Sequence, residues 1–235
     1  MVSLQAFSSR SRNRQKAEKF GSTLFIMNVD VAFIADVSQL FEYPNEEEEL
    51  IAPDKDLMDQ QSKQRVIIVH GSAITPGIIN RHWYKWLQAE LVKLGFDAIA
   101  PALPDEKEAK DSIWIPFLLN NIGVAENDIL IGHSSGAMAI LRVCEQVKVK
   151  GLILVSAGYY DHDVDQLWNW NKIKANAQWI EQFHSSDDPF TPVNSSRHIA
   201  KEVQSTYHEF NDRNHFLCTE FPDLIDVIKY RCGLS

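Results

Sequence analysis

The chain has 235 residues, of which 45% are hydrophobic and 23% are charged, and this balance is typical of a soluble globular protein. A formal net charge of −9 argues against a general nucleic-acid-binding protein, because contacts with phosphate groups need a basic face. The sequence has no apolar run of about 18 residues, so no membrane-spanning helix is expected, and its three cysteines lack the spacing of a disulfide framework or a zinc site.

The first 62 residues differ in composition from the rest of the chain. They begin with a segment rich in arginine, lysine and serine, and they end in Pro44, the acidic run from Glu46 to Glu49 and a polar stretch. We interpret residues 1–62 as a flexible or partly ordered extension and residues 63–235 as one folded domain. The unpaired cysteines favour the cytoplasm, while the basic start leaves a mitochondrial targeting peptide open as the alternative.

Short apolar runs alternate with longer amphipathic segments from residue 65 onward. Short runs that are apolar on both faces predict buried strands, here at residues 65–71, 96–101, 128–132, 150–158, 178–185 and 206–211. Apolar residues at helical spacing predict helices between the strands, at residues 81–95, 112–123, 135–147, 195–204 and 221–232.

This alternation implies a parallel sheet with helices on both faces, joined by right-handed connections. We therefore predict a doubly wound, mostly parallel α/β fold. Ligands of such sheets bind at the carboxyl ends of the strands. Candidate functional residues are accordingly those that follow a predicted strand.

The segment "DILIGHSSGAMAI", residues 128–140, crowds glycine and serine between a predicted strand and a helix. Gly132, Ser134 and Gly136 fit the pattern G-x-S-x-G, in which a serine on a tight strand-to-helix turn becomes an exposed nucleophile. The alternative is an ordinary turn in which Ser134 only caps the following helix. The two interpretations differ in whether a base and an acid also reach this turn.

A serine hydroxyl is a weak nucleophile at neutral pH and needs a base that is oriented by an acid. In this fold the chain order is serine, then acid, then histidine. Asp188 follows the predicted strand 178–185, and His215 follows the predicted strand 206–211, so both fit that order. Asp187 competes with Asp188 for the role of the acid, and the order alone does not separate them.

Hydrolysis of a carbonyl compound also needs hydrogen-bond donors for the developing oxyanion. The backbone N–H of Ser135, directly after the candidate nucleophile, is one expected donor. The second is expected from the loop "HGSAITPG" after the first strand, at Ser72 or Ala73.

Five separated motifs between residues 64 and 232 resemble the retinoblastoma-binding protein 9 or YdeN-like family of serine hydrolases. These motifs are "IGHSSGAMA", "DSIWIPFLL", "WNWNKIKAN", "SSDDPFTP" and "NHFLCTEFPDLI", in matching order. The resemblance implies a compact α/β-hydrolase with a minimal cap, acting through Ser134, Asp188 and His215. It also implies activity on esters and on small amide or amino-acid-type substrates. The D-x-x-x-P spacing from Asp188 to Pro192 resembles the acid loop of α/β-hydrolases and favours Asp188 over Asp187.

The chain departs from the family pattern in three places. The loop "HGSAITPG" is closer to the bacterial form than to the glycine-rich loop of the vertebrate members, so the resemblance does not define the oxyanion geometry. The retinoblastoma-binding motif L-x-C-x-E is absent and is only approached by "FLCTE" at residues 216–220, so such a partner is not supported. Residues 1–62 have no counterpart in the family.

The sequence predicts a serine hydrolase of small esters or amides that needs no metal and no cofactor. Trp114, Trp168 and Trp170 are candidates for the wall of the substrate pocket, although packing in the core or at its rim explains such residues equally well. One rival hypothesis is a catalytically silent protein-binding scaffold that keeps the hydrolase fold. A second is another α/β-hydrolase chemistry, such as a lyase or transferase reaction, on the same triad. Fold and triad do not fix the substrate, so its identity stays open.

Overall fold

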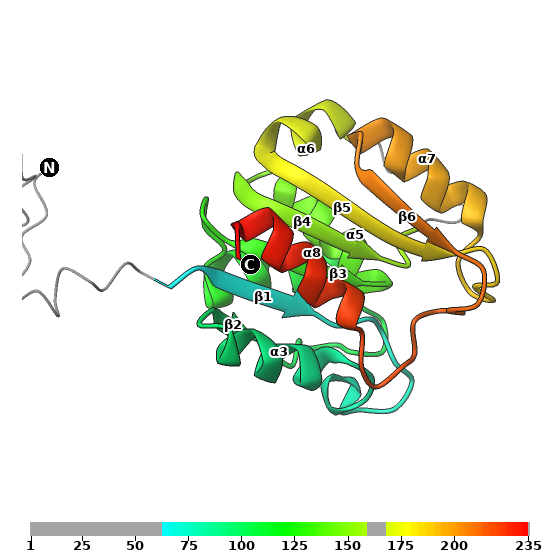
Figure 1. Ribbon diagram of the computed structural model, residues 1–235, viewed down its shortest axis with the longest axis horizontal. Helices are drawn as coiled ribbons and strands as arrows, with labels where there is room; N and C mark the ends of the chain where they lie inside the picture. Colours follow the sequence, from blue (N-terminus) through cyan, green and yellow to red (C-terminus); the bar gives the residue numbers. More distant parts are fainter. Residues whose placement is uncertain (1–62, 159–167, 235) are drawn as a thin grey trace, which may run out of the picture. The chain divides into compact units, whose positions relative to one another are not determined.

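The computed structural model describes residues 63–158 and 168–234 (Figure 1). The predicted extension, residues 1–62, lies outside the described residues. The described part is a parallel sheet with helices on both faces, as the sequence predicts.

Six strands form the sheet in the order β2-β1-β3-β4-β5-β6, and every neighbouring pair is parallel. All six lie where the sequence predicts strands, with ends shifted by a few residues. Their bounds are β1 Arg65–Val69, β2 Asp97–Ile99, β3 Ile129–His133, β4 Val149–Val155, β5 Ala177–Ser185 and β6 Thr206–Phe210.

The central strands are apolar on both faces because helices cover both. In β1, the side chains of Val66 and Ile68 enter one hydrophobic core, and those of Ile67 and Val69 enter the other. Successive side chains of a strand point to opposite faces, so a run of four apolar residues supplies both cores. Complete burial of each such side chain stabilises the fold by roughly 1.5–3 kcal/mol.

Two helices cover one face of the sheet, and four cover the other. The first pair is α3 (Tyr84–Lys93) with α8 (Pro222–Cys232), and α8 lies across the face that Figure 1 turns toward the viewer. The second group is α4 Asp111–Pro116, α5 Ser135–Cys144, α6 Trp170–Asn176 and α7 Val193–Val203.

Two helical regions differ from the sequence-based expectation. The predicted helix at 112–123 is divided into α4 and a π-helical segment, η3 (Phe117–Ile122), because Pro116 has no N–H to continue the regular ladder. A short 3₁₀ helix, η2 (Ile78–Asn80), and the positive φ of His82 delay the start of α3 beyond the predicted residue 81.

Helix α6 was not predicted from the sequence. Only its Ile173 is fully buried, so the apolar periodicity that marks a helix is weak over its seven residues. Its start is marked instead by Asn169, whose side chain accepts a hydrogen bond from the backbone N–H of Lys172.

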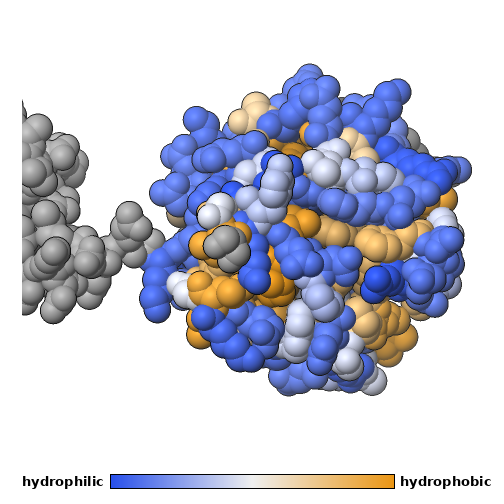
Figure 2. All heavy atoms as spheres, in the orientation of Figure 1, coloured by the Kyte–Doolittle hydropathy of each residue, from blue (hydrophilic) through white to orange (hydrophobic). Residues whose placement is uncertain are grey.

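Hydrophilic residues dominate the surface that faces the viewer in Figure 2, with apolar residues visible between the elements. No helix within residues 63–158 and 168–234 is long and apolar enough to cross a membrane. The apolar side chains of the described chain are concentrated in the two cores.

The turn between β3 and α5 brings the backbone unusually close to neighbouring segments. A Cβ atom added to Gly136 would lie 2.4 Å from the carbonyl oxygens of both Val69 and His70, at the end of β1. A Cβ atom on Gly132 would lie 2.5 Å from the carbonyl oxygen of Gly136. Helix α5 can therefore start directly against β1 only because both positions lack a side chain.

We expect Gly136→Ala to lower the free energy of unfolding by about 3 kcal/mol or more, because the backbone around the added methyl group must move. Gly123→Ala is the control. Gly123 has a φ of 68° and open space around its Cβ position, so alanine there meets only the conformational cost of roughly 1–2 kcal/mol. Urea unfolding followed by circular dichroism measures both variants, and equal stability of the two would contradict this account of the turn.

Candidate active site

The candidate site is assembled at the carboxyl ends of three strands. Ser134 follows β3, Asp188 follows β5, and His215 lies in the segment between β6 and α8. That segment reaches the end of β3, where the ring Nε2 of His133 lies 2.8 Å from the carbonyl oxygen of His215. The rings of these two histidines are 5.0 Å apart. The candidate base is thereby held beside the residue that precedes the candidate nucleophile.

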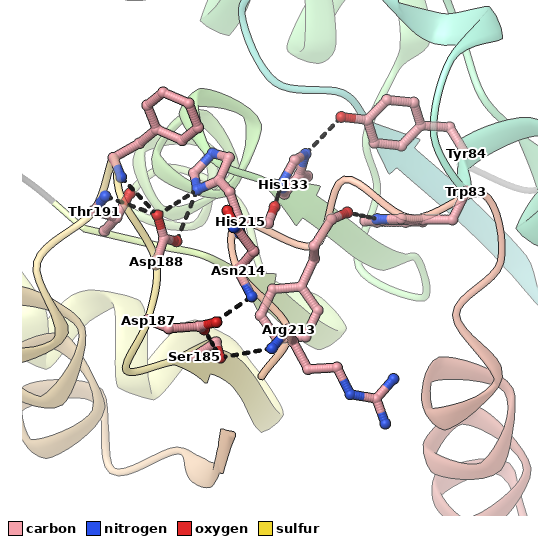
Figure 3. A network of polar contacts seen from close by, with 12 residues as sticks. Trp83, Tyr84, His133, Ser185, Asp187, Asp188, Thr191, Arg213, Asn214 and His215 are labelled. Carbon is pink, nitrogen blue, oxygen red and sulfur yellow. Dashed lines mark hydrogen bonds and ion pairs between the residues drawn. The ribbon is translucent and has the colours of Figure 1, made fainter. Parts of the chain in front are cut away.

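Asp188 and His215 form a close pair (Figure 3). The Nδ1 atom of His215 lies 2.7 Å and 2.9 Å from the two carboxylate oxygens of Asp188. The same carboxylate accepts hydrogen bonds from the backbone N–H groups of Phe190 and Thr191. Burial alone would raise the pKa of Asp188, but these hydrogen bonds outweigh it and lower the pKa, so the side chain is ionised at neutral pH.

Asp187 has a different set of partners. Its carboxylate accepts hydrogen bonds from the Ser185 hydroxyl and from the backbone N–H of Asn214, at 2.5 Å and 2.9 Å. These bonds, chiefly the one from Ser185, lower the pKa of Asp187. Figure 3 shows that Asp187 contacts the backbone before His215, whereas Asp188 contacts the ring itself. The order of residues did not show which of the two aspartates contacts the histidine ring, and the geometry shows that Asp188 does.

Ser134 has the backbone conformation of a nucleophile elbow. Its φ is 53° and its ψ is −122°, in a region that residues with a side chain rarely adopt. Its N–H donates to the carbonyl oxygen of Val155 at the end of β4, which fixes the turn to the sheet. Its side chain makes no capping hydrogen bond to α5. The alternative that Ser134 acts only as a helix cap is wrong for this conformation.

The two predicted donor segments for an oxyanion are adjacent. The Ser135 hydroxyl donates to the Ser72 hydroxyl at 3.0 Å. As the first residue of α5, Ser135 has a backbone N–H that no intrahelical carbonyl can accept. The N–H of Ala73, in contrast, donates to the carbonyl oxygen of Glu106 at 2.8 Å. Ala73 is thus already committed, which leaves Ser72 as the better candidate of the two.

Trp114 is a core residue and does not line a pocket. None of its surface is exposed, and its indole N–H donates to the carbonyl oxygen of Pro104. The edge of its ring packs against His70, with centroids 5.3 Å apart. The expectation that Trp114 forms a substrate pocket wall is corrected accordingly.

Trp168 and Trp170 lie together but away from the elbow. Their rings stack with centroids 5.1 Å apart, and the Arg142 guanidinium lies 3.5 Å from the Trp168 ring centroid. Arg142 is about two helical turns, roughly 12 Å, along α5 from Ser134. The two tryptophans border an open surface cavity of about 410 Å³ with Asn169, Asn171 and Glu202, and this cavity has no lining residue in common with the candidate triad.

Three exposed apolar side chains accompany the predicted site residues, and the sequence analysis did not identify them. They are Ile74, Phe190 and Leu217. The edge of the Phe190 ring packs against the His215 ring, with centroids 5.0 Å apart. Each residue lies within one or two positions of a predicted site residue, and exposed apolar side chains beside such residues are the signal that could have found them.

His133 and Tyr84 form a buried polar pair behind the elbow. The Tyr84 hydroxyl lies 2.5 Å from the Nδ1 atom of His133. Burial, with a smaller contribution from the neighbouring His215, lowers the pKa of His133 to about 3. His133 is therefore a neutral hydrogen-bonding residue at physiological pH. The Tyr84 partner is separated from it by 49 positions, so no local pattern could have paired them.

The parallel sheet, the strained serine between two closely packed glycines and the Asp–His pair define an α/β-hydrolase. The model of the serine hydrolase family matches residues 66–221. The serine hydrolase RBBP9 of Rattus norvegicus is 39% identical over 183 residues, which cover 72% of this chain and 95% of that protein. The chain belongs to the serine hydrolase family, which confirms the resemblance seen in its motifs.

Solved structures agree with this assignment. The crystal structure of the ydeN gene product from B. subtilis has a TM-score of 0.66 at 26% identity and covers 73% of this chain and all of its own. Est1E from Butyrivibrio proteoclasticus has a TM-score of 0.56 at 12% identity, covering 73% of this chain and 89% of its own. The second likeness shows the fold alone.

We expect the free energy of unfolding to fall as the pH drops from 7 to 5. An unfolded histidine binds a proton near pH 6.5, whereas folded His133, with its pKa near 3, does not. The unfolded state therefore binds more protons in this window, and His133 alone accounts for a loss on the order of 2 kcal/mol. Burial also lowers the pKa of His70, His82 and His184, which act in the same direction.

Urea unfolding at pH 7, 6 and 5 measures this dependence. The His133→Gln variant has no titrating group at this position, so its stability should fall less steeply with pH. An identical slope for the variant and the wild-type protein would contradict the assignment of His133 as a buried neutral histidine.

Proposed function

We propose that the protein hydrolyses small ester or amide substrates through Ser134, His215 and Asp188. His215 accepts the proton of the Ser134 hydroxyl at Nε2, and the serine oxygen attacks the substrate carbonyl carbon. The Asp188 carboxylate accepts a hydrogen bond from the Nδ1–H of His215, which holds the neutral ring in the tautomer whose Nε2 is a base. The ionised carboxylate also stabilises the imidazolium that forms.

The backbone N–H groups of Ser135 and Ser72 are proposed to stabilise the oxyanion of the tetrahedral intermediate. The hydroxyl contact between these residues supports their closeness. Protonated His215 then gives its proton to the leaving alcohol or amine, which leaves an acyl group on Ser134. Water, deprotonated by His215, releases the acid and restores the serine.

The observation that carries this proposal is the Asp188–His215 pair at the sheet edge where Ser134 adopts its strained turn. A positive φ at a residue with a side chain costs on the order of 1–3 kcal/mol. Placing a buried carboxylate there also needs hydrogen bonds to compensate for lost hydration. A silent binding scaffold has no need for this combination, so the arrangement supports the hydrolase over the scaffold.

The exposed Phe190 ring beside His215 supports substrates with an apolar group next to the scissile carbonyl. Est1E and the other relatives do not determine the substrate of this chain. We also propose a reducing compartment, most simply the cytoplasm. The cysteines Cys144, Cys218 and Cys232 form no disulfide among the described residues, which supports this placement.

Substitution of the two neighbouring aspartates tests the proposed triad. Asp188→Asn is expected to lower kcat/KM for an activated ester such as p-nitrophenyl acetate by about 10⁴-fold, because asparagine favours the wrong tautomer of His215. Asp187→Asn is the matched control and keeps an oxygen acceptor for Ser185 and Asn214, so its loss should stay below about tenfold. Ser134→Ala should abolish turnover of this ester while the protein stays folded, because the attacking oxygen is removed. A larger loss for Asp187→Asn than for Asp188→Asn would overturn the assignment.

A further inference from the structure

His133 connects three parts of the candidate site through its ring. Its Nε2 atom contacts the carbonyl oxygen of His215 at 2.8 Å, and its Nδ1 atom contacts the hydroxyl of Tyr84 at 2.5 Å. The same hydroxyl is 3.3 Å from the backbone nitrogen of Gly71. Gly71 immediately precedes Ser72, and His133 immediately precedes Ser134. The contacts therefore link the oxyanion loop, the nucleophile turn and the base, in part visible in Figure 3.

The direction of each hydrogen bond in this series is fixed by the two backbone groups at its ends, the N–H of Gly71 and the carbonyl oxygen of His215. The carbonyl oxygen of His215 can only accept, so Nε2 of His133 must bear the proton and donate it. The Nδ1 atom of the neutral ring is then an acceptor, and the Tyr84 hydroxyl donates to it. The backbone N–H of Gly71 donates to the Tyr84 oxygen in turn. Each donor in this series therefore meets one acceptor, which gives the series a single direction.

The surroundings of the His133 ring keep it neutral. His133 is 2% exposed, and its ring is enclosed by Trp83, Tyr84, His82 and His215. Protonation would place a charge in this buried space and would remove the acceptor that Tyr84 needs. The neutral ring consequently has one donor, Nε2–H, and one acceptor, Nδ1. It therefore holds the His215 carbonyl and the Tyr84 hydroxyl at a fixed separation.

We propose that His133 is a positioning residue for hydrolysis, which sets the separation between the Ser134 oxygen and the His215 ring. This inference depends on the proposed function, because it presupposes that His215 accepts the proton of Ser134. His133 itself is assigned no contact with the substrate. The residue acts through the backbone of His215 on one side and through its own peptide link to Ser134 on the other. Productive proton transfer needs the two side chains within hydrogen-bond reach, and a displacement of 1 Å can cost about 100-fold in rate.

Other contacts hold the loop in the folded state without His133. The Trp83 indole N–H donates to the carbonyl oxygen of Phe216, and Asp187 accepts from the N–H of Asn214. The residues on both sides of His215 thus keep their anchors when the His133 bond is removed. Loss of the bond should alter the placement of the His215 backbone and leave the loop attached to the domain.

The test compares His133→Leu, His133→Gln and His208→Leu in the full-length chain. Leucine removes both hydrogen-bonding atoms at similar volume, whereas glutamine keeps an N–H that can donate to the carbonyl oxygen of His215. His208 is the matched control: it is a partly buried histidine that contacts Phe183 and Glu181 and lies outside the candidate site. Steady-state hydrolysis of p-nitrophenyl acetate and thermal unfolding are measured for each variant.

We expect His133→Leu to lower kcat by about 100-fold with KM changed less than about twofold. His133→Gln should recover at least a tenth of the wild-type kcat, and His208→Leu should lose thermal stability while keeping kcat. A His133→Leu protein with wild-type kcat, or a loss that glutamine does not rescue, overturns the inference.

Labelling of the same proteins with a fluorophosphonate separates this inference from the proposed function. Slow labelling of folded His133→Leu beside rapid, Ser134-dependent labelling of the wild-type protein supports the positioning role. Equal labelling rates overturn that role and leave the proposed function standing. A folded wild-type protein that does not label overturns the proposed function and the inference together.

Discussion

The close packing of the turn between β3 and α5 is the constraint on which the rest of the structure depends. Gly136 allows the backbone of α5 to touch the carbonyl groups at the end of β1, and Gly132 allows the turn to fold back on itself. This contact brings the loop after β1 beside Ser134 and leaves Ser134 in a conformation with a positive φ. The stability of the two apolar cores on either side of the sheet outweighs the strain of this one residue.

Around this turn, the segment that bears His215 is fixed at several successive points. Asp187 and Asp188, after β5, hold the backbone of Asn214 and the ring of His215. Trp83, just before α3, and His133, at the end of β3, hold the backbone carbonyl groups of Phe216 and His215. Because the anchors come from separate elements, the position of the ring is set by the whole sheet edge. Preorganisation of this kind means that little rearrangement is needed when charge develops in a reaction.

The sequence predicted the parts of this structure that depend on local patterns. All six strands and five helices were expected from apolar runs and spacing, and the glycine–serine turn and the strand-end positions of Asp188 and His215 were expected from chain order. The resemblance to a family favoured Asp188. Only the three-dimensional contacts show that Asp188 binds the His215 ring, whereas Asp187 binds the backbone N–H of Asn214. That the three residues act together in catalysis stays a prediction.

Features that depend on distant partners could not be predicted. The Ala73 N–H is occupied by a carbonyl group 33 positions away, and Trp114 is buried by elements on both sides of it in the chain. The most direct test of the central claim is mass spectrometry of the purified protein after reaction with a fluorophosphonate, with peptide mapping of the adduct. The account predicts one phosphonate on Ser134 and none on the Ser134→Ala protein. A folded wild-type chain without an adduct, or an adduct on Ser135, would contradict it.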